Sequence, residues 1–136
     1  MPWPKSTKTI RIPQGNLFAS DCPTRHILND VTSRWGSLVL VLLLKGSSYR
    51  FSELAHLIGG VSEKMLAQTL RALVEDGFVL RTVVALKPPK VEYRLTLSGR
   101  EIAERMQALT SYIEANVAQV MTHRARATKK KAQMLI

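Results

Sequence analysis

The chain has 136 residues, of which 20 are lysine or arginine and 10 are aspartate or glutamate, so its formal net charge is +10. This length suits one domain with a single core, and the 46% of hydrophobic residues exclude disorder of the whole chain. The charge favours a polyanionic partner, with nucleic acid ahead of an anionic membrane, although a basic protein without such a partner would have the same composition.

The cysteine content and the apolar runs restrict the setting of the protein. Cys22 is the single cysteine, which excludes an intrachain disulfide and fits a reducing cytoplasm. The first residues lack an apolar segment, so we expect no secretory signal. The longest apolar run, residues 38–44, is much shorter than the about 20 residues of a membrane span. We therefore expect a cytoplasmic protein with no membrane partner.

In chain order, residues 1–16 come first and combine prolines with basic side chains. We expect a flexible basic arm there, either a disordered leader or a segment that touches phosphates or crosses a dimer. The first predicted helix follows, with Cys22 at its N-cap and Pro23 at the first helical position. Its apolar face consists of Ile27, Leu28 and Val31.

The second predicted element is the apolar run of residues 38–44. Ser37 is placed to cap a helix there, and Lys45 and Gly46 are placed to end it. Periodicity alone would equally allow a buried strand. The start and stop signals favour a helix.

Two more helices follow, separated by a glycine turn. We expect Ser52 to cap the short third helix, Gly59 and Gly60 to end it, and Ser62 to cap the longer fourth helix. Two sets of residues repeat at i, i+4, i+7 in the fourth helix, which predicts a buried stripe and an opposite polar face. The buried set is Leu66, Leu70 and Leu73, and the polar set is Lys64, Gln68 and Arg71.

A β-ribbon is predicted after the fourth helix. Residues 79–83 and 91–95 alternate with the period of strands, and residues 85–90 form a stiff link with two prolines and two lysines. A short helix, a glycine turn, a longer helix and a basic ribbon in this order predict a winged helix-turn-helix.

A long amphipathic helix closes the predicted fold. Residues 98–101 resemble a capping box, and behind them apolar residues recur every three or four positions. This stripe exceeds what so small a domain can cover, so we expect a second chain to cover much of it. The predicted dimer interface comprises Met106, Leu109, Ile113, Val117 and Val120. We expect residues 123–136 to form a basic, frayed tail.

The fourth helix is the predicted DNA-reading element. Arginine and lysine donate to guanine in the major groove and glutamine pairs with adenine, and the donors here are Ser62, Lys64, Gln68, Thr69 and Arg71. The wing lysines Lys87 and Lys90 suit phosphates or the minor groove. Arg50 is either a contact to the DNA backbone or an ordinary surface arginine. A polar helix face alone is usually only solvated, but the neighbouring helix, turn and wing favour DNA binding.

The sequence offers little for catalysis. There is no glycine-rich phosphate loop, and the histidines stand far apart, so we expect no enzyme activity, no metal site and no cofactor. Cys22 is the one reactive candidate, as a redox sensor. An N-cap position and the nearby Arg25 should lower the pKa of its thiol, whereas Asp21 should raise it. The alternative is a small buried residue without chemistry.

Several segments of the chain resemble the HxlR-type transcriptional regulators, which are relatives of the MarR group. The resemblance is collinear over about residues 20 to 115, and it is carried by Cys22-Pro23, Ser33-Arg34-Trp35, residues 50–54, 61–66, 75–77 and 88–93, and Leu95-Thr96. It implies a homodimeric winged helix-turn-helix protein that binds a palindromic operator.

The resemblance also bears on Cys22. Some members of that family sense electrophiles or oxidants through the matching cysteine, commonly with a second cysteine that this chain lacks. That leaves an intersubunit Cys22–Cys22 bond, a mixed disulfide or a thiol adduct. The chain departs from the family pattern at Ser33, where glycine is usual, at Gly36, where threonine is usual, and at residues 84–86, which lack an aromatic side chain.

Together these features predict a mainly α (α+β) fold, a winged helix-turn-helix with a long C-terminal dimerisation helix. Residues 1–16 are the arm, residues 17–122 the domain and residues 123–136 the tail. The predicted function is a sequence-specific DNA-binding regulator, a dimeric repressor at a palindromic operator that responds to oxidants or electrophiles through Cys22. The effector itself is unknown. The alternative is a winged-helix module that binds proteins instead of DNA, but the basic helix and wing favour DNA.

Overall fold

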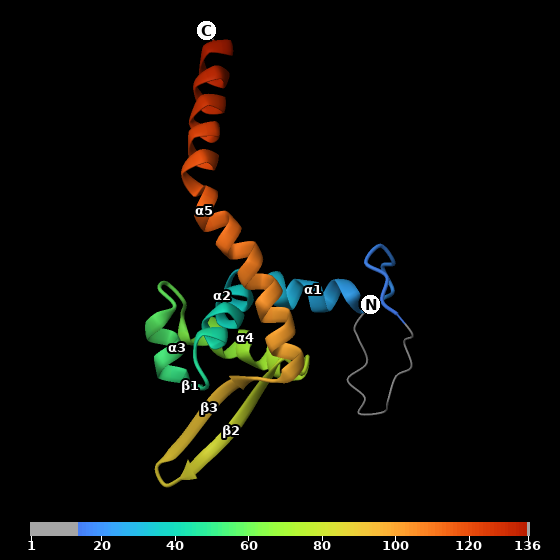
Figure 1. Cartoon of the computed structure of the whole chain (residues 1–136), viewed down its shortest axis with the longest axis vertical. Coiled ribbons are helices and arrows are strands. Elements are labelled where there is room, and N and C mark those ends of the chain that lie inside the picture. Colours follow the sequence, from blue (N-terminus) through green and yellow to red (C-terminus); the bar gives the residue numbers. More distant parts are fainter. Residues whose placement is uncertain (1–13, 136) are drawn as a thin grey trace.

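The computed structural model describes residues 14–135 and confirms the mainly helical winged helix-turn-helix (Figure 1). Residues 1–13, which hold most of the predicted arm, lie outside the described part. In chain order the elements are α1 (Thr24–Thr32), α2 (Arg34–Lys45), β1 (Tyr49–Arg50), α3 (Phe51–Leu57), α4 (Glu63–Glu75), β2 (Val79–Leu86), β3 (Pro89–Leu95) and α5 (Leu97–Met134).

The core lies where α2 meets α4 and the first turns of α5. Helix α2 is the central element, and it supplies Val39, Leu40 and Leu43 to the core. The predicted leucine stripe of α4 is fully buried against it, so that part of the sequence prediction is confirmed. Val79 at the start of β2 and Ala103 of α5 close the core, in which the ribbon packs on α4 and the last helix packs on α2.

Helix α2 begins four residues earlier than its apolar run, because Ser33 and not Ser37 is its N-cap. The Ser33 hydroxyl accepts a hydrogen bond from the Gly36 N–H and donates one to the Asp30 carbonyl, both at 3.0 Å. A Cβ on residue 36 would collide with that carbonyl and would lie 2.5 Å from the Ser33 hydroxyl oxygen. Serine at 33 and glycine at 36 therefore belong together, although each departs from the family pattern.

The helix-turn-helix is formed by α3 and α4. Ser52 was expected to cap α3, but the helix begins at Phe51, and the Arg50 N–H donates to Glu53 Oε1 at 2.9 Å. In the turn that follows, Gly60 has φ +86°, which L side chains rarely adopt. Ser62 caps α4 as predicted, since its hydroxyl accepts from the Met65 N–H at 3.1 Å.

The wing is the β2–β3 ribbon of a three-stranded antiparallel sheet with the order β1-β3-β2. Its strands run farther than predicted, from the pair Val79↔Leu95 to the pair Leu86↔Pro89. The tip is therefore a tight turn at Lys87 and Pro88, instead of the six-residue link expected from the sequence. Strand β1 was not predicted, because two residues carry no alternation pattern.

Helix α5 begins at Leu97, and Thr96 is its N-cap, so the predicted start at residue 98 is wrong. The Thr96 hydroxyl accepts from the Gly99 N–H at 2.9 Å and donates to the Gly77 carbonyl at 2.6 Å, which fixes α5 to the end of α4. The helix continues through residues 123–134, where a frayed tail was expected. No glycine or proline follows Gly99 to interrupt it.

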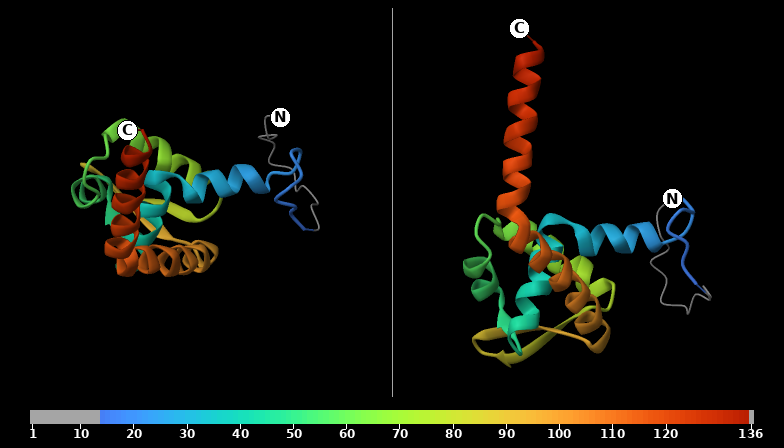
Figure 2. Two further views of the ribbon diagram at one scale, coloured as in Figure 1. Left: turned by 90° about the horizontal axis from the view of Figure 1, so that it is seen from above. Right: turned by 45° about the horizontal axis from the view of Figure 1, so that its top comes forward.

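Helix α1 projects sideways from the body, and the distal half of α5 leaves the body altogether (Figure 2). Of the predicted apolar face of α1, only Val31 is buried, while Ile27 and Leu28 are 37% and 41% exposed. Within residues 14–135 no single helix is long and apolar enough to cross a membrane. The pair α1 and α2, bent by 70°, meets that test by length and composition only when taken together.

Candidate nucleic-acid interface

The outer face of α4 carries four of the five donors predicted on this helix. The leucine stripe holds the opposite face in the core, and this leaves Ser62, Lys64, Gln68 and Arg71 exposed. Thr69 is an exception and corrects the prediction, because it is only 8% exposed. Its hydroxyl donates to the Met65 carbonyl at 2.7 Å, so it is satisfied inside its own helix.

The wing tip presents the two predicted lysines in different settings. Lys87 is exposed in the turn itself. The Lys90 ammonium lies 3.8 Å from Glu92 Oε1, and the other oxygen of that carboxylate accepts from the Ser48 hydroxyl at 3.2 Å. A surface pair of this kind is weak, so Lys90 keeps its capacity to bind a phosphate.

Strand β1 brings Arg50 to the wing, across about 40 residues of sequence. Arg50 pairs with Glu92 in the sheet register, two residues along β3 from the predicted wing contact Lys90. An open groove of about 520 Å³ separates the start of α3 from the wing tip, lined in part by Arg50, Phe51, Pro88, Pro89 and Lys90. The structure thus places two predicted contacts, Arg50 and Lys90, in the lining of one groove.

Arg81 belongs to the same surface and was missed in the sequence prediction. It lies exposed on β2 and lines a small groove of about 210 Å³ together with Arg71 of α4 and Tyr93 of β3. The signal was present, because alternation places Arg81 on the same face of its strand as the buried Val79. That face points toward α4.

The positive charges of this surface are largely uncompensated. Within residues 14–135 the two ion pairs are His26 with Asp30 and Lys90 with Glu92. Lys64, Arg71, Arg81 and Lys87 take part in neither. An exposed helix with unpaired basic side chains beside a basic ribbon suits a polyanionic groove.

Residues 30–121 match the family model described as HxlR-like helix-turn-helix. The chain belongs to this family. Its relatives are described as HTH-type transcriptional regulators and not as enzymes, and a helix-turn-helix family implies DNA as the partner. The HxlR-like resemblance predicted from the sequence is therefore confirmed.

Individual relatives extend over most of the HxlR-like chain. The Escherichia coli protein YtfH, described as an uncharacterised HTH-type transcriptional regulator, is 51% identical over 114 residues, which are 84% of this chain and 90% of YtfH. The solved structure of YtfH from Salmonella typhimurium is also 51% identical, with a TM-score of 0.78 over 82% of this chain and 99% of its own. HypR, a redox regulator solved in its reduced form, is 29% identical with a TM-score of 0.66, covering 74% and 98%.

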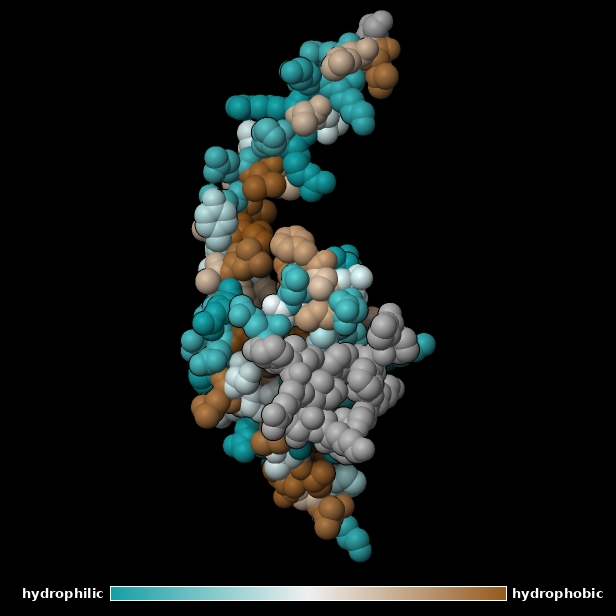
Figure 3. All heavy atoms as spheres, turned by 90° about the vertical axis from the view of Figure 1, so that its right-hand side faces the viewer, coloured by the Kyte–Doolittle hydropathy of each residue, from teal (hydrophilic) through white to brown (hydrophobic). Residues whose placement is uncertain are grey.

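The predicted dimer face of α5 is an uncovered apolar stripe in this HxlR-like chain. Leu109, Ile113, Val117 and Val120 are 50–53% exposed. Hydrophobic side chains gather along the middle of α5 in Figure 3, between the body and the mostly hydrophilic end of the helix. Met106 corrects the prediction, because it is only 8% exposed and is therefore buried by its own chain.

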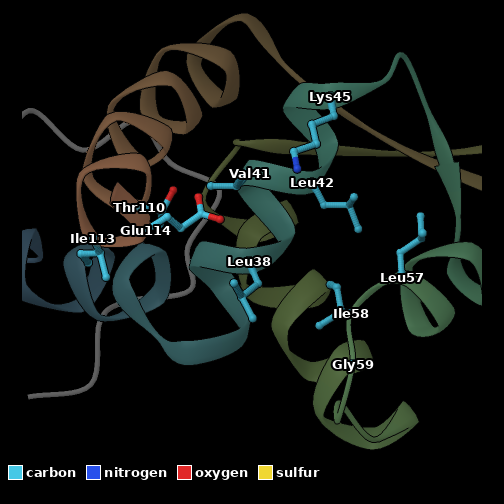
Figure 4. Close-up of a pocket in the computed structure, with 10 residues that line it drawn as sticks. All are labelled: Leu38, Val41, Leu42, Lys45, Leu57, Ile58, Gly59, Thr110, Ile113 and Glu114. Atoms are coloured by element: carbon cyan, nitrogen blue, oxygen red, sulfur yellow. The ribbon is translucent and has the colours of Figure 1, made fainter. Parts of the chain in front are cut away.

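An apolar pocket of about 390 Å³ adjoins this stripe (Figure 4). Leu38 and Leu42 of α2 and Leu57 of α3 line one side, and Ile113 of α5 lines the other. Because Ile113 belongs to the stripe as well, the pocket and the stripe form one continuous apolar surface.

Cys22 lies just before α1, since Pro23 is the N-cap, so the predicted N-cap position of the cysteine is wrong. Its sulfur lies 3.1 Å from the Thr24 hydroxyl and accepts from the Asn16 N–H at 3.3 Å. These hydrogen bonds, with Thr24 first, lower the pKa of the thiol, and Asp21 opposes them. Arg25 was expected to lower this pKa, but it is not among the causes of the shift. Its guanidinium instead donates to the carbonyls of Leu17 and Phe18.

A carboxyl pair joins α1 to the end of α4. Asp76, the C-cap of α4, has its pKa raised to about 7 by burial and then by the neighbouring Asp30 of α1 and Glu75. Its Oδ2 is buried and accepts no hydrogen bond within residues 14–135, so a proton shared with Asp30 would satisfy this carboxyl. The position fits no metal site, because the described residues hold no group of three suitable ligands.

Proposed function

We propose that this HxlR-like chain works as a homodimeric repressor that binds a palindromic operator in duplex DNA. The observation that carries the proposal is the exposed basic face of α4 beside a basic wing, on a helix whose other face is locked in the core. Such a protein acts where the chromosome lies, in the cytoplasm.

In this proposal the contacts divide by position. Gln68 and Arg71 on α4 read base edges in the major groove, and Ser62 and Lys64 at the start of the helix assist them. Lys87 and Lys90 of the wing, with Arg50, hold phosphates and set the register of the protein on DNA. Arg81 of β2 adds a further positive charge beside Arg71, because the two side chains line one groove.

A second copy would cover the uncovered apolar surface. The α5 stripe, the adjoining pocket and the exposed side of α1 together exceed the scattered apolar exposure of a monomer. A two-fold symmetric dimer formed through this surface would present two copies of α4. To read successive major grooves, these two helices must lie about 34 Å apart. Operator symmetry would then mirror the symmetry of the dimer.

Cys22 is the proposed sensor, and this part of the proposal draws on the likeness to HypR. The lowered pKa of its thiol favours the thiolate, which is the reactive form. With one cysteine per chain, the thiolate can add to an electrophilic carbon, or two Cys22 thiols of a dimer can form a disulfide. In that second case an oxidant such as diamide takes up the two electrons and two protons.

The test is selection of genomic fragments by the purified protein, followed by footprinting of the selected sites. The proposal expects inverted half-sites about one helical turn apart, and affinity that falls on the order of a thousandfold between 50 and 200 mM salt for about 6–10 phosphate contacts. No enrichment together with a flat salt response would contradict it. That outcome would favour the alternative, a winged-helix module that binds proteins.

A further inference from the structure

The end of α5 concentrates positive charge. Residues 121–134 carry Arg124, Arg126, Lys129, Lys130 and Lys131, and the last acidic residue of the chain is Glu114. Five of the 20 basic residues thus lie in one short stretch with no acidic neighbour. The family model ends at residue 121, so this charge lies beyond the matched domain.

These charges have no partner within the described part of the chain. Every residue from 117 to 135 is exposed, and neither of the two ion pairs among residues 14–135 involves this segment. The helix dipole favours basic residues near a helix C-terminus, but its effect is confined to the last turn. It therefore explains few of these basic residues. Lys131 is the one basic residue in that turn.

The basic segment lies at the opposite end of the molecule from the wing (Figures 1 and 2). Helix α5 has 38 residues. At about 1.5 Å per residue such a helix is up to about 57 Å long, and it starts beside the wing and runs away from it. A duplex that lies along the wing is therefore far from residues 121–134 of the same chain.

The chemistry of the segment favours DNA over a membrane. A helix that lies on a bilayer needs an apolar face with large side chains such as leucine or phenylalanine. Large apolar side chains stand only at the two ends of the segment, at Met121 and at Met134 and Leu135, and the uncharged residues between them are alanine, threonine, histidine and glutamine, so no continuous apolar face of this kind runs along it. Phosphate binding in contrast needs only accessible positive charges.

We propose that residues 121–134 form a second, sequence-independent binding surface for duplex DNA, by which a dimer on its operator holds a separate DNA segment. This inference rests on the DNA-binding function proposed above. The two surfaces differ in kind, since α4 reads a defined site, whereas the end of α5 binds the phosphates of any duplex.

The experiment compares three full-length proteins. The test variant replaces Arg124, Arg126, Lys129, Lys130 and Lys131 with glutamine, which keeps helix propensity and removes the charge. The control variant replaces Ala125, Ala127 and Thr128 with glutamine in the same segment, which leaves the charge unchanged. Circular dichroism checks that both variants keep the helix content of the wild type.

Each protein is bound to an immobilised operator duplex, and retention of a fluorescent random-sequence duplex is then measured at 50 mM salt. Wild type and control should retain it, and the test variant should retain at least about tenfold less, with operator affinity changed by less than about twofold. The salt exponent for the second duplex should drop by up to about 4.5 for the five charges lost in each protomer that contacts it, at about 0.9 per phosphate contact.

Three results would overturn the inference. Equal retention by all three proteins would leave the charge without this role. If the test variant lost as much affinity for the operator as for the random duplex, the segment would touch the operator duplex itself. Tighter binding of the wild type to phosphatidylserine vesicles than to the random duplex would assign the segment to membranes. If no operator can be selected, the proposed function fails, while salt titration of the random duplex alone still tests the segment.

Discussion

At the scale of single residues, position in the fold decides what each polar side chain of α4 can do. Gln68 and Thr69 are neighbours in sequence, yet Gln68 is exposed, whereas Thr69 is buried and bonded to its own helix. A turn of 100° per residue separates a base-reading candidate from a packing residue. The exposed donors of α4 are therefore the residues whose substitution should change sequence preference.

Replacing Gln68 or Arg71 with alanine should cost about 1–3 kcal/mol for each lost base contact on operator DNA, and much less on random DNA. Lys87→Ala and Lys90→Ala should instead weaken binding to both by similar factors, because phosphate contacts carry no sequence information. Equilibrium titrations of operator and random duplexes at one salt concentration measure both effects. If the α4 variants and the wing variants changed the two affinities in the same way, the division between base-reading residues and phosphate-binding residues would be refuted.

Cys22 should react faster at neutral pH than an ordinary exposed cysteine, because hydrogen bonds from Thr24 and Asn16 lower the pKa of its thiol. Thr24→Val removes the largest of these contributions and should shift the midpoint of a pH–alkylation profile upward. Diamide should reduce operator affinity in the wild type and leave Cys22→Ser unchanged. Equal affinity of the wild type with and without diamide would make Cys22 structural.

At the scale of elements, the link between α1 and α4 depends on protonation. Asp30 lies near the end of α1 and pairs with His26 at 3.7 Å, and Asp76 caps the end of α4. Glu75 adds a further negative charge. Ionisation of Asp76 brings like charges together at the contact between α1 and α4, the proposed DNA-reading helix.

The Asp76 carboxyl should therefore make the fold less stable as the pH rises. Its pKa is about 7 in the folded chain against 3.8 in the unfolded reference. The native state then binds more protons, and the contribution is fully present below pH 3.8 and lost as the pH rises through about 7. Asp76→Asn should flatten this dependence and raise the free energy of unfolding at pH 8 by on the order of 1 kcal/mol, less than a full shift implies because the site is partly exposed.

Urea unfolding of the wild type and Asp76→Asn at pH 5 and pH 8 tests this prediction. Glu75→Gln serves as a comparison, since it removes the smallest of the contributions that raise the pKa of Asp76, leaves Asp30 and Asp76 in place and should keep most of the pH dependence. If wild type and Asp76→Asn lose the same stability between the two pH values, the pair does not titrate as described.

The elements also show how far sequence could predict this fold. The leucine stripe of α4 and the Ser62 cap were predictable because they repeat or act within a few residues. Helix starts at Arg34, Phe51 and Leu97 were misplaced because several residues near each could cap. Strand β1 depends on pairing with a distant segment, which local patterns do not contain. For Arg81, alternation along the strand gave the face, but only the packing of the ribbon shows that Arg71 of α4 lines the same groove.

At the scale of the whole molecule, the protomer exposes two surfaces of opposite chemistry. The wing lies at one end, next to the body that holds α4, and α5 with its apolar stripe rises from the body toward the other end (Figure 1). A second copy on the stripe would double the basic face, so dimerisation and DNA affinity should change together.

Ile113→Asp tests this coupling at the centre of the stripe. Ile113 is 53% exposed in the protomer, so the substitution should leave the fold intact, whereas in a dimer it would bury an unpaired charge at a cost of several kcal/mol. We expect monomers by sedimentation equilibrium and weak operator binding. Ser111→Asp adds the same charge to an exposed position of α5 off the stripe and should remain dimeric with wild-type affinity. A dimeric Ile113→Asp would move the interface elsewhere, to the exposed side of α1 and the segment before it.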